Sequence, residues 1–280
     1  MPPIADSSAV LDKRRLLPQH QVALTLIHTK VSKPHITSFR WLDLCCGKGQ
    51  IIVNLEDTFP ENIRKKIEYH FHDGNSKYLI TAQKKAEDLK FKQVQVYHSE
   101  IEKMSAIIPQ ELHHDFITII NSIHELSPFF LPVLFFECLI RLSNTGTLYV
   151  YDMVTINPLE LGSVTWTRDE IQEMVTTFLI GITLTDYQPT ANLWHHSTCD
   201  AWSLEIQKEF LKSTEEIIVN QEKIITATQQ KVKELLDRKL ESSSLALESY
   251  TKYKTETQED EWKRMQCLFD FYTITRILKK

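Results

Sequence analysis

Apolar and polar positions in the first 151 residues follow two different periods. Short apolar or alternating runs of four to six residues, typical of strands, are separated by stretches in which apolar residues recur at helical spacing. The five expected strands lie at 39–44, 69–72, 94–97, 116–120 and 147–151. Helical stretches separate most of them, so the pattern predicts an α/β fold with a doubly wound, mostly parallel sheet.

The pattern changes beyond residue 160. A helix is predicted from Thr167 to Phe178, because Asp169 and Glu170 fall in its first turn, where acidic side chains favour the helix dipole. Runs at 181–187 and 201–206 then follow each other with no helix between them. Directly joined strands can pair antiparallel, so we expect a seven-stranded sheet that ends in an antiparallel hairpin.

Helical patterns flank this sheet on both sides. Residues 9–31 indicate one or two N-terminal helices with Pro18 between them, and from Ser213 onward the chain has neither glycine nor proline. We expect two amphipathic helices there, with a break at 242–244. The predicted organisation is therefore an N-terminal helical segment, an α/β domain and a C-terminal helical extension, at 1–37, 38–212 and 213–280.

The C-terminal extension also carries a short heptad pattern. Ile218, Ile225 and Val232 are seven residues apart, and Trp262, Phe269, Phe271 and Tyr272 add aromatic surface further on. Such a surface must cover the domain itself, a second copy of the chain or a different protein. We favour homodimerisation through the first helix over its packing back onto the domain.

Composition narrows the function classes. The net charge is −5 and the isoelectric point is about 6.1, which argues against a nucleic-acid binding protein, and DNA in particular is an improbable partner. Five scattered cysteines suggest no disulfide framework, which favours a reducing, cytoplasmic location. The apolar run at 128–140 contains two prolines and a glutamate and is too short to span a membrane.

The chain has only six glycines, and two of them stand close together in the run Leu42-Asp-Leu-Cys-Cys-Gly-Lys-Gly49. Gly47 and Gly49 come at the end of the first strand, where backbone N–H groups and a helix dipole favour an anionic ligand group. Asp73 ends the second strand, 24 residues past Gly49, and can accept hydrogen bonds from ribose hydroxyls. The third glycine of a dinucleotide-binding turn is replaced by Ile52, which favours a nucleoside with a short carboxylate tail over a pyrophosphate.

In its Asp-x-x-Cys-Gly-x-Gly form this run resembles the first motif of class I S-adenosylmethionine-dependent methyltransferases, which have a Rossmann-like domain. The resemblance covers about residues 38–207. Residues 72–76 resemble the family's ribose-binding loop, 99–101 its adenine loop and 121–126 the loop after its fourth strand. Two departures stand out: Cys45 and Cys46 replace the usual small residues, and Glu100 replaces the commoner aspartate.

The resemblance implies S-adenosyl-L-methionine as the cofactor and assigns roles to residues of this chain. Asp43 would orient the methionine amino group, backbone near the two glycines would line the methionine tail, and Asp73 would hold the ribose. The implied cofactor-binding residues are Asp43, Cys45, Gly47, Gly49, Asp73, Gly74, Glu100, Ile101 and Asn121.

Three histidines are candidates for a general base on the acceptor side. His124 follows the fourth strand, and His195 and His196 lie between the last two strands, in a segment, 188–200, that we expect to overhang the acceptor pocket. For each of them the alternative is an ordinary structural or surface histidine. We assign no metal site, because His195, His196 and Cys199 have no fourth ligand at a recognisable spacing.

The main hypothesis is a methyltransferase that acts on an oxygen or nitrogen of a small molecule or of a protein side chain. One alternative is a non-catalytic S-adenosylmethionine-binding scaffold or sensor that acts through its C-terminal helices. Another is an RNA methyltransferase, since short basic runs occur at 13–15 and 64–66. DNA base methylation is disfavoured, because no Asn/Asp-Pro-Pro-Tyr loop follows the fourth strand and no Pro-Cys nucleophile is present.

Overall fold

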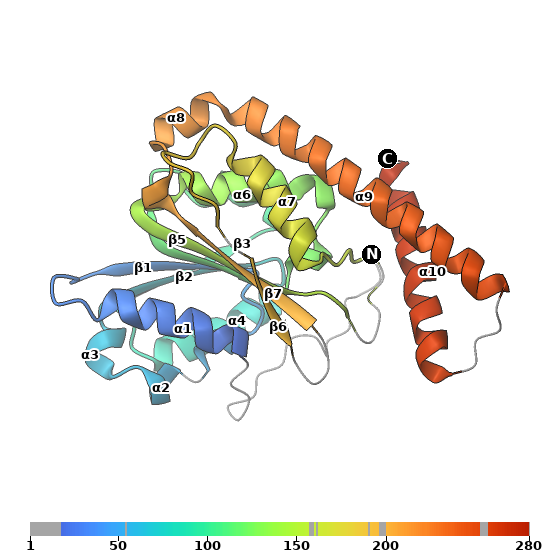
Figure 1. The fold of residues 1–280 in the computed structure, drawn as a ribbon. Helices are drawn as coiled ribbons and strands as arrows, with labels where there is room; N and C mark the ends of the chain where they lie inside the picture. Colours follow the sequence, from blue (N-terminus) through green and yellow to red (C-terminus); the bar gives the residue numbers. More distant parts are fainter. Residues whose placement is uncertain are drawn as a thin grey trace.

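A computed structural model describes residues 18–53, 55–156, 160, 162–189, 191–195, 200–252 and 257–279. Within these residues seven strands form one sheet in the order β3-β2-β1-β4-β5-β7-β6 (Figure 1). The first five strands are parallel, β7 is antiparallel to β5, and β6 is antiparallel to β7. The strands are β1 (Phe39–Leu44), β2 (Ile67–Asp73), β3 (Gln93–His98), β4 (His114–Ile120), β5 (Leu142–Met153), β6 (Ala191–His195) and β7 (Asp200–Gln207).

Helices cover both faces of this sheet (Figure 1). On one face lie α1 (Pro18–Val31), α2 (Leu55–Thr58), α3 (Glu61–Arg64) and α4 (Ser76–Asp88). The other face carries α5 (Met104–Ile107), α6 (Leu131–Ile140), α7 (Arg168–Leu179), α8 (Thr214–Val219) and α9 (Gln221–Lys252). The last helix, α10 (Gln258–Leu278), packs against α9 at the far end from α8. No helix in the described ranges is both long enough and apolar enough to cross a membrane.

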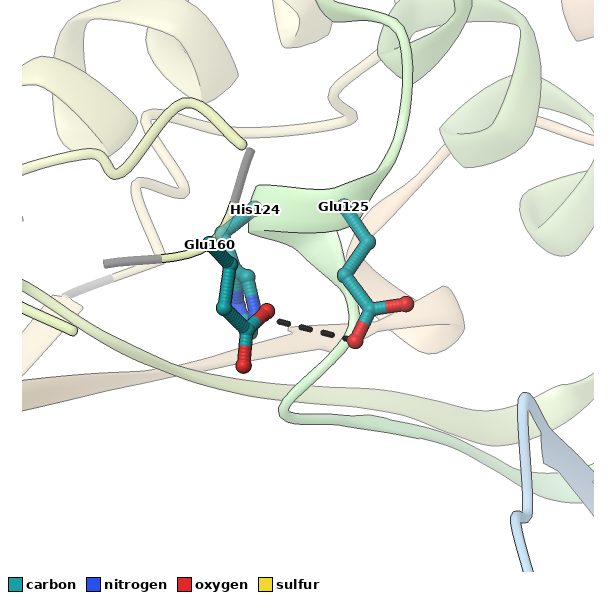
Figure 2. Close-up of side chains that lie close together, drawn as sticks. All are labelled: His124, Glu125 and Glu160. Carbon is teal, nitrogen blue, oxygen red and sulfur yellow. Dashed lines mark ion pairs between the residues drawn. The ribbon is translucent and has the colours of Figure 1, made fainter. Parts of the chain in front are cut away.

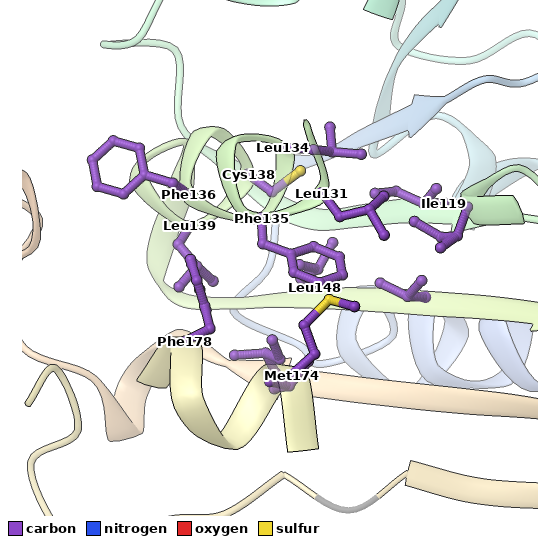
Figure 3. Close-up of a cluster of buried hydrophobic side chains, with 14 of the residues drawn as sticks. Ile119, Leu131, Leu134, Phe135, Phe136, Cys138, Leu139, Leu148, Met174 and Phe178 are labelled. Atoms are coloured by element: carbon purple, nitrogen blue, oxygen red, sulfur yellow. The ribbon is translucent and has the colours of Figure 1, made fainter. Parts of the chain in front are cut away.

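Strand periodicity divides the core into two clusters. Successive side chains of a strand point to opposite faces, so Trp41 joins the cluster under α1 and α4, whereas Leu42 joins the cluster under α6 and α7. Figure 3 shows the second cluster, in which Phe135 and Leu139 of α6 meet Phe178 of α7. Burial on both faces explains why the central strands read as continuous apolar runs.

Strand order places a topological switch point at the carboxyl ends of β1 and β4. From β1 the chain continues to β2 and β3 on one side, and then crosses back to β4 and β5 on the other. Loops that leave β1 and β4 therefore run in opposite directions, and ligands of doubly wound sheets bind at this switch point.

The five parallel strands and the helix at α7 confirm the sequence prediction, but the sixth strand does not lie at 181–187. Only Thr183 of that run makes a bridge, to Leu211, and Leu184 is exposed. The edge of β7 is occupied by 191–195, because Ala191 pairs with Leu204 and His195 with Asp200. Residues 191–195 of the expected overhanging segment 188–200 therefore form the edge strand β6.

The helix break expected at 242–244 is also wrong. Helix α9 runs without interruption from Gln221 to Lys252, and Ser243 is buried on it. Serine costs a helix only a fraction of a kcal/mol relative to alanine, so three serines do not end a helix whose face is packed. Helix α10 begins at Gln258 and is capped by Thr257, whose side chain accepts a hydrogen bond from the Asp260 N–H.

Helix α9 packs back onto the domain. Ile224, Val232, Leu235 and Leu236 are buried in the same cluster as α6 and α7, while Ile218 stays exposed, so the heptad positions do not form one exposed seam. Ion pairs from Lys239 to Glu170 (2.8 Å) and from Arg238 to Glu173 (2.7 Å) add to this contact. Homodimerisation stays a prediction. A dimer interface would have to use other residues than Val232, because Val232 is buried in the domain.

Candidate functional site

The glycine turn after β1 has the backbone geometry of a ligand-binding loop. Cys45, Gly47 and Gly49 all have positive φ, at 55°, 56° and 80°. This left-handed region is unfavourable for Cys45, which has a Cβ, and such strain clusters at functional sites. A Cβ on Gly49 would lie 3.2 Å from the Ala82 Cβ of α4, so this glycine also lets the turn pack closely on the helix.

Asp73 is bonded to the glycine turn. Its Oδ2 accepts a hydrogen bond from the Gly47 N–H (2.8 Å), and its Oδ1 accepts one from the Asn75 N–H (2.8 Å). Burial raises the pKa of the Asp73 carboxyl, and its two backbone bonds partly oppose that rise. A carboxylate can accept about four hydrogen bonds, so both oxygens keep capacity for the hydroxyls of a ribose.

The expected adenine loop lies next to Asp73. Glu100 is exposed, and its Oε2 lies 3.7 Å from the position of a Cβ on Gly74, which places the three residues 73, 74 and 100 together. Ile101, in contrast, is buried in the core under α6. The ends of β2 and β3 are joined by contacts between the Gly74 carbonyl and the His98 ring (3.2 Å) and between the His72 ring and Ser99 Oγ (3.1 Å).

Asp43 is buried and bonded to the strands on either side of it. Its Oδ2 accepts a hydrogen bond from the Tyr69 hydroxyl (2.8 Å) and its Oδ1 accepts one from the Thr118 hydroxyl (2.7 Å). Trp41 Nε1 donates to the same Thr118 hydroxyl at 2.9 Å. Burial raises the pKa of Asp43 to about 6, although the two hydrogen bonds act to lower it. In this position Asp43 joins β1 to β2 and β4; its role toward a methionine amino group stays a prediction.

Asn121 lies at the end of β4, opposite the glycine turn. It has a φ of 54°, and its N–H donates to the Tyr151 carbonyl at 2.9 Å. Its side-chain Oδ1 is buried and has no hydrogen-bond partner among the described residues. A buried acceptor without a donor is costly, so this oxygen is suited to a donor group on a ligand, such as the ammonium of a methionine tail.

His124 lies on a short 3₁₀ helix, Ile123–Glu125, directly after β4. Its ring is buried, and Nδ1 lies 2.6 Å from Oδ1 of Asp152, near the end of β5. The His124 backbone N–H donates to Oδ2 of the same Asp152 (2.9 Å). On the other side of the ring, Nε2 lies 3.5 Å from Glu160 and 3.8 Å from Glu125. Figure 2 shows both glutamate carboxyl groups turned toward this ring.

The pKa of His124 lies well above the ordinary value of a histidine. Burial acts to lower its pKa, but Asp152, Glu160 and Glu125 raise it to about 10. The pKa of Glu125 is raised by its own burial and by the neighbouring carboxyl groups of Glu160 and Asp152. The imidazole therefore holds its proton near neutral pH, and acts as a hydrogen-bond donor before it can act as a base.

The other acceptor-side candidates lie elsewhere on the same sheet edge. His195 is exposed and pairs with Asp200 across β6 and β7 at 2.8 Å, apart from the His124 cluster. His196 and Cys199 lie outside the described residues. Cys45 and Cys46 have pKa values raised well above the ordinary value by burial, so their thiols stay neutral and are poor nucleophiles.

Sequence reasoning missed three residues of the His124 cluster. Asp152 could have been found, because it is a carboxylate near the carboxyl end of a buried parallel strand. Glu125 directly follows His124 in the sequence. Glu160 lies in a connection after β5 and has no recognisable signal. Because β4 pairs with β1, the loop that carries His124 and Glu125 leaves the sheet next to the glycine turn.

Comparison with known proteins identifies the family. A family model described as a methyltransferase domain matches residues 37–266, most of the chain. Among solved structures, the CurJ carbon methyltransferase superposes with a TM-score of 0.52 at 16% identity, covering 68% of this chain and 54% of that one. The citrinin polyketide synthase CMeT domain gives 0.52 at 18% identity, covering 68% and 52%. The chain thus spans about half the length of these two structures.

A third structure, magnesium protoporphyrin IX methyltransferase from Synechocystis PCC 6803 with bound S-adenosylhomocysteine, has a TM-score of 0.48 at 10% identity, covering 69% of this chain and 83% of that one. No match was found among curated protein sequences. The two structures with a TM-score of 0.52 show a shared fold. The family model covers more than half of the chain, so this chain belongs to the methyltransferase-domain family, Rossmann-like enzymes whose cofactor is S-adenosyl-L-methionine.

Proposed function

We propose that this enzyme moves the methyl group of S-adenosylmethionine to an oxygen or nitrogen atom of a small molecule or of a protein side chain. The observation that carries this proposal is the buried His124, which is oriented by Asp152 and faces two carboxyl groups at the ligand edge of the sheet. An oxygen or nitrogen acceptor has polar atoms that need donors and acceptors in a dry site, and such a cluster supplies both.

The cofactor would lie across the ends of β1, β2 and β4. Asp73 would accept hydrogen bonds from the ribose hydroxyls, and the unpartnered Oδ1 of Asn121 would accept one from the methionine ammonium. The left-handed turn at Cys45 and Gly47 would bring the backbone close to the methionine tail. When bound, S-adenosylmethionine supplies an electrophilic methyl carbon.

The acceptor would lie over the ends of β4 and β5. His124 Nε2, held by the Asp152 contact on the other side of the ring, would donate a hydrogen bond and direct an acceptor lone pair toward the cofactor. Glu125 and Glu160 lie 3.8 and 3.5 Å from that nitrogen, and either carboxylate can take the acceptor's proton. His195 and His196 stay proposed as further acceptor-side residues.

Calorimetry with S-adenosylhomocysteine tests the cofactor site. Asp73→Ala removes hydrogen bonds to a charged acceptor, worth about 1.5–3 kcal/mol, so affinity should fall roughly 10- to 150-fold. Asp88→Ala, at the exposed end of α4, is the control and should bind as the unchanged protein does. Equal affinity in the Asp73 variant would show that the ribose lies elsewhere.

Turnover tests the acceptor class. Methyl-labelled cofactor is incubated with the protein and separate small-molecule, protein and RNA fractions of a cell extract. Label in the small-molecule or protein fraction, with release of S-adenosylhomocysteine, is the expected result. Label found only in RNA would overturn the proposed acceptor class. Binding without release in any fraction would favour a non-catalytic scaffold or sensor.

A further inference from the structure

We propose that His124, Glu125 and Glu160 form a binding site for one divalent transition-metal ion that prefers tetrahedral coordination, such as Zn²⁺. One ligand atom from each of these residues lies within 4.8 Å of the other two. The proposal deepens the proposed function, on which it rests. A bound ion would replace the proton on His124 Nε2, and the ion would then position the acceptor in place of the hydrogen bond from that nitrogen. The sequence offers no recognisable spacing for it, because Glu160 lies 35 residues beyond Glu125.

The distances fit a metal better than they fit direct hydrogen bonds. His124 Nε2 lies 3.5 Å from Glu160 Oε2 and 3.8 Å from Glu125 Oε1. Good hydrogen bonds to nitrogen are shorter, at about 2.7–3.2 Å. Two ligands on a tetrahedral ion with bonds of about 2.1 Å lie about 3.4 Å apart, so a small adjustment of side chains would suffice.

Independent support comes from the far side of the imidazole. Metal-binding histidines commonly bond a carboxylate through the other ring nitrogen, which orients the ring and selects its tautomer. Asp152 makes this contact with Nδ1 at 2.6 Å and also accepts the His124 backbone N–H at 2.9 Å. The His124 side chain is only 3% exposed, so Nε2 is aimed at the two glutamates by a rigid, buried support.

The local charge also favours a cation. Three carboxyl groups, from Asp152, Glu125 and Glu160, surround one imidazole. Both glutamate side chains are 36% exposed, so an ion could reach the site without opening the core. A histidine with two carboxylates is a mixed nitrogen and oxygen set, which suits Zn²⁺, Co²⁺ or Mn²⁺ and is a poor match for Mg²⁺.

Such an ion would have a ligand position free for the methyl acceptor. Three protein ligands plus one open position is the usual arrangement of catalytic zinc sites. An acceptor with an oxygen or nitrogen donor could occupy the fourth position, next to the cofactor loops. The acceptor class would then be set by metal binding as well as by shape.

The test is titration of the metal-free full-length protein with Zn²⁺ by calorimetry and with Co²⁺ by visible absorption. Binding of one ion, with the intense visible bands of tetrahedral Co²⁺, is expected. Glu160→Gln and Glu125→Gln should each weaken binding at least about tenfold, and Asp152→Asn about 10- to 100-fold. The matched control is His35→Asn, which changes an exposed histidine before β1, outside the proposed cofactor and acceptor sites, and should leave this binding unchanged.

No Zn²⁺ binding at about millimolar concentration would overturn the proposal, as would equal binding by the unchanged protein and both glutamine variants. Because Glu160 is partly exposed and lies in a connection, its variant is expected to fold even where the Asp152 variant does not. S-adenosylhomocysteine affinity is measured on the same samples. Retained cofactor binding without zinc binding would overturn the metal site alone, whereas loss of both would also count against the proposed function.

Discussion

Two buried histidine sites in this protein have pKa values shifted in opposite directions. His70 on β2 and His114 on β4 contact each other, with Nδ1 of the first 3.2 Å from Nε2 of the second. Burial lowers the pKa of His70 to about 4 and that of His114 to about 3, and the charge of Arg40 adds to both shifts. His124 is just as buried, yet its pKa is raised to about 10.

The difference teaches that partners, rather than burial, decide the charge of a histidine in this fold. Desolvation disfavours the charged ring at all three positions. Only His124 has a carboxyl group in direct contact on each side of its ring. The pair of neutral rings lies within the sheet and serves packing, whereas the charged ring lies at the ligand edge, where perturbed titrating groups indicate chemistry.

The largest expected loss of stability comes from removing the carboxylate of Asp152, which distinguishes the His124 site from the pair of His70 and His114. Asp152→Ala would leave a buried imidazolium without its partner and a buried N–H without an acceptor. Breaking a buried ion pair in this way costs about 3–5 kcal/mol, so the free energy of unfolding measured in urea should fall by that amount. A loss below about 1 kcal/mol would mean that Asp152 does not hold the histidine charge.

A smaller loss of stability is expected when the neutral pair of His70 and His114 is exposed to acid. His70 and His114 have folded-state pKa values below the ordinary 6.5, so the unfolded chain binds more protons and stability falls as pH drops below 6.5 toward 4. Each ring contributes up to about 1.4 kcal/mol per pH unit in that window. Urea unfolding at about pH 7 and about pH 5 should show a clearly smaller loss for His114→Gln than for the unchanged protein. Identical losses would argue against buried neutral rings.

The smallest expected effect lies at the exposed pair of His195 and Asp200. This pair has nearly the geometry of His124 with Asp152, at 2.8 Å, but the side chains are 73% and 50% exposed. Exposed pairs contribute about 0–1 kcal/mol, so Asp200→Ala should leave the urea midpoint almost unchanged. A loss comparable to that of Asp152→Ala would show that contact geometry alone, without burial, determines the contribution of a pair.

Local sequence signals were sufficient to predict those features of the structure that depend on residues close together in the sequence. The glycine turn after β1 needs left-handed backbone at positions that glycine tolerates, and the two glycines marked it. The start of α7 is a capping box between Thr167 and Glu170, which a short pattern can reveal. The parallel strands were predicted because burial on both faces requires continuous apolar runs.

Only the tertiary structure decided the features that depend on distant partners. The edge of β7 selects 191–195 as the sixth strand, and packing against α6 and α7 keeps α9 helical through its serines. The same holds for the candidate site: the His124 cluster unites residues from the loop after β4, the end of β5 and a connection further on. The sequence by itself determined where the five parallel strands and the turns between them lie along the chain, because those follow from local spacing. Which side chains meet across the sheet edge is determined by strand order and register, which no local pattern encodes.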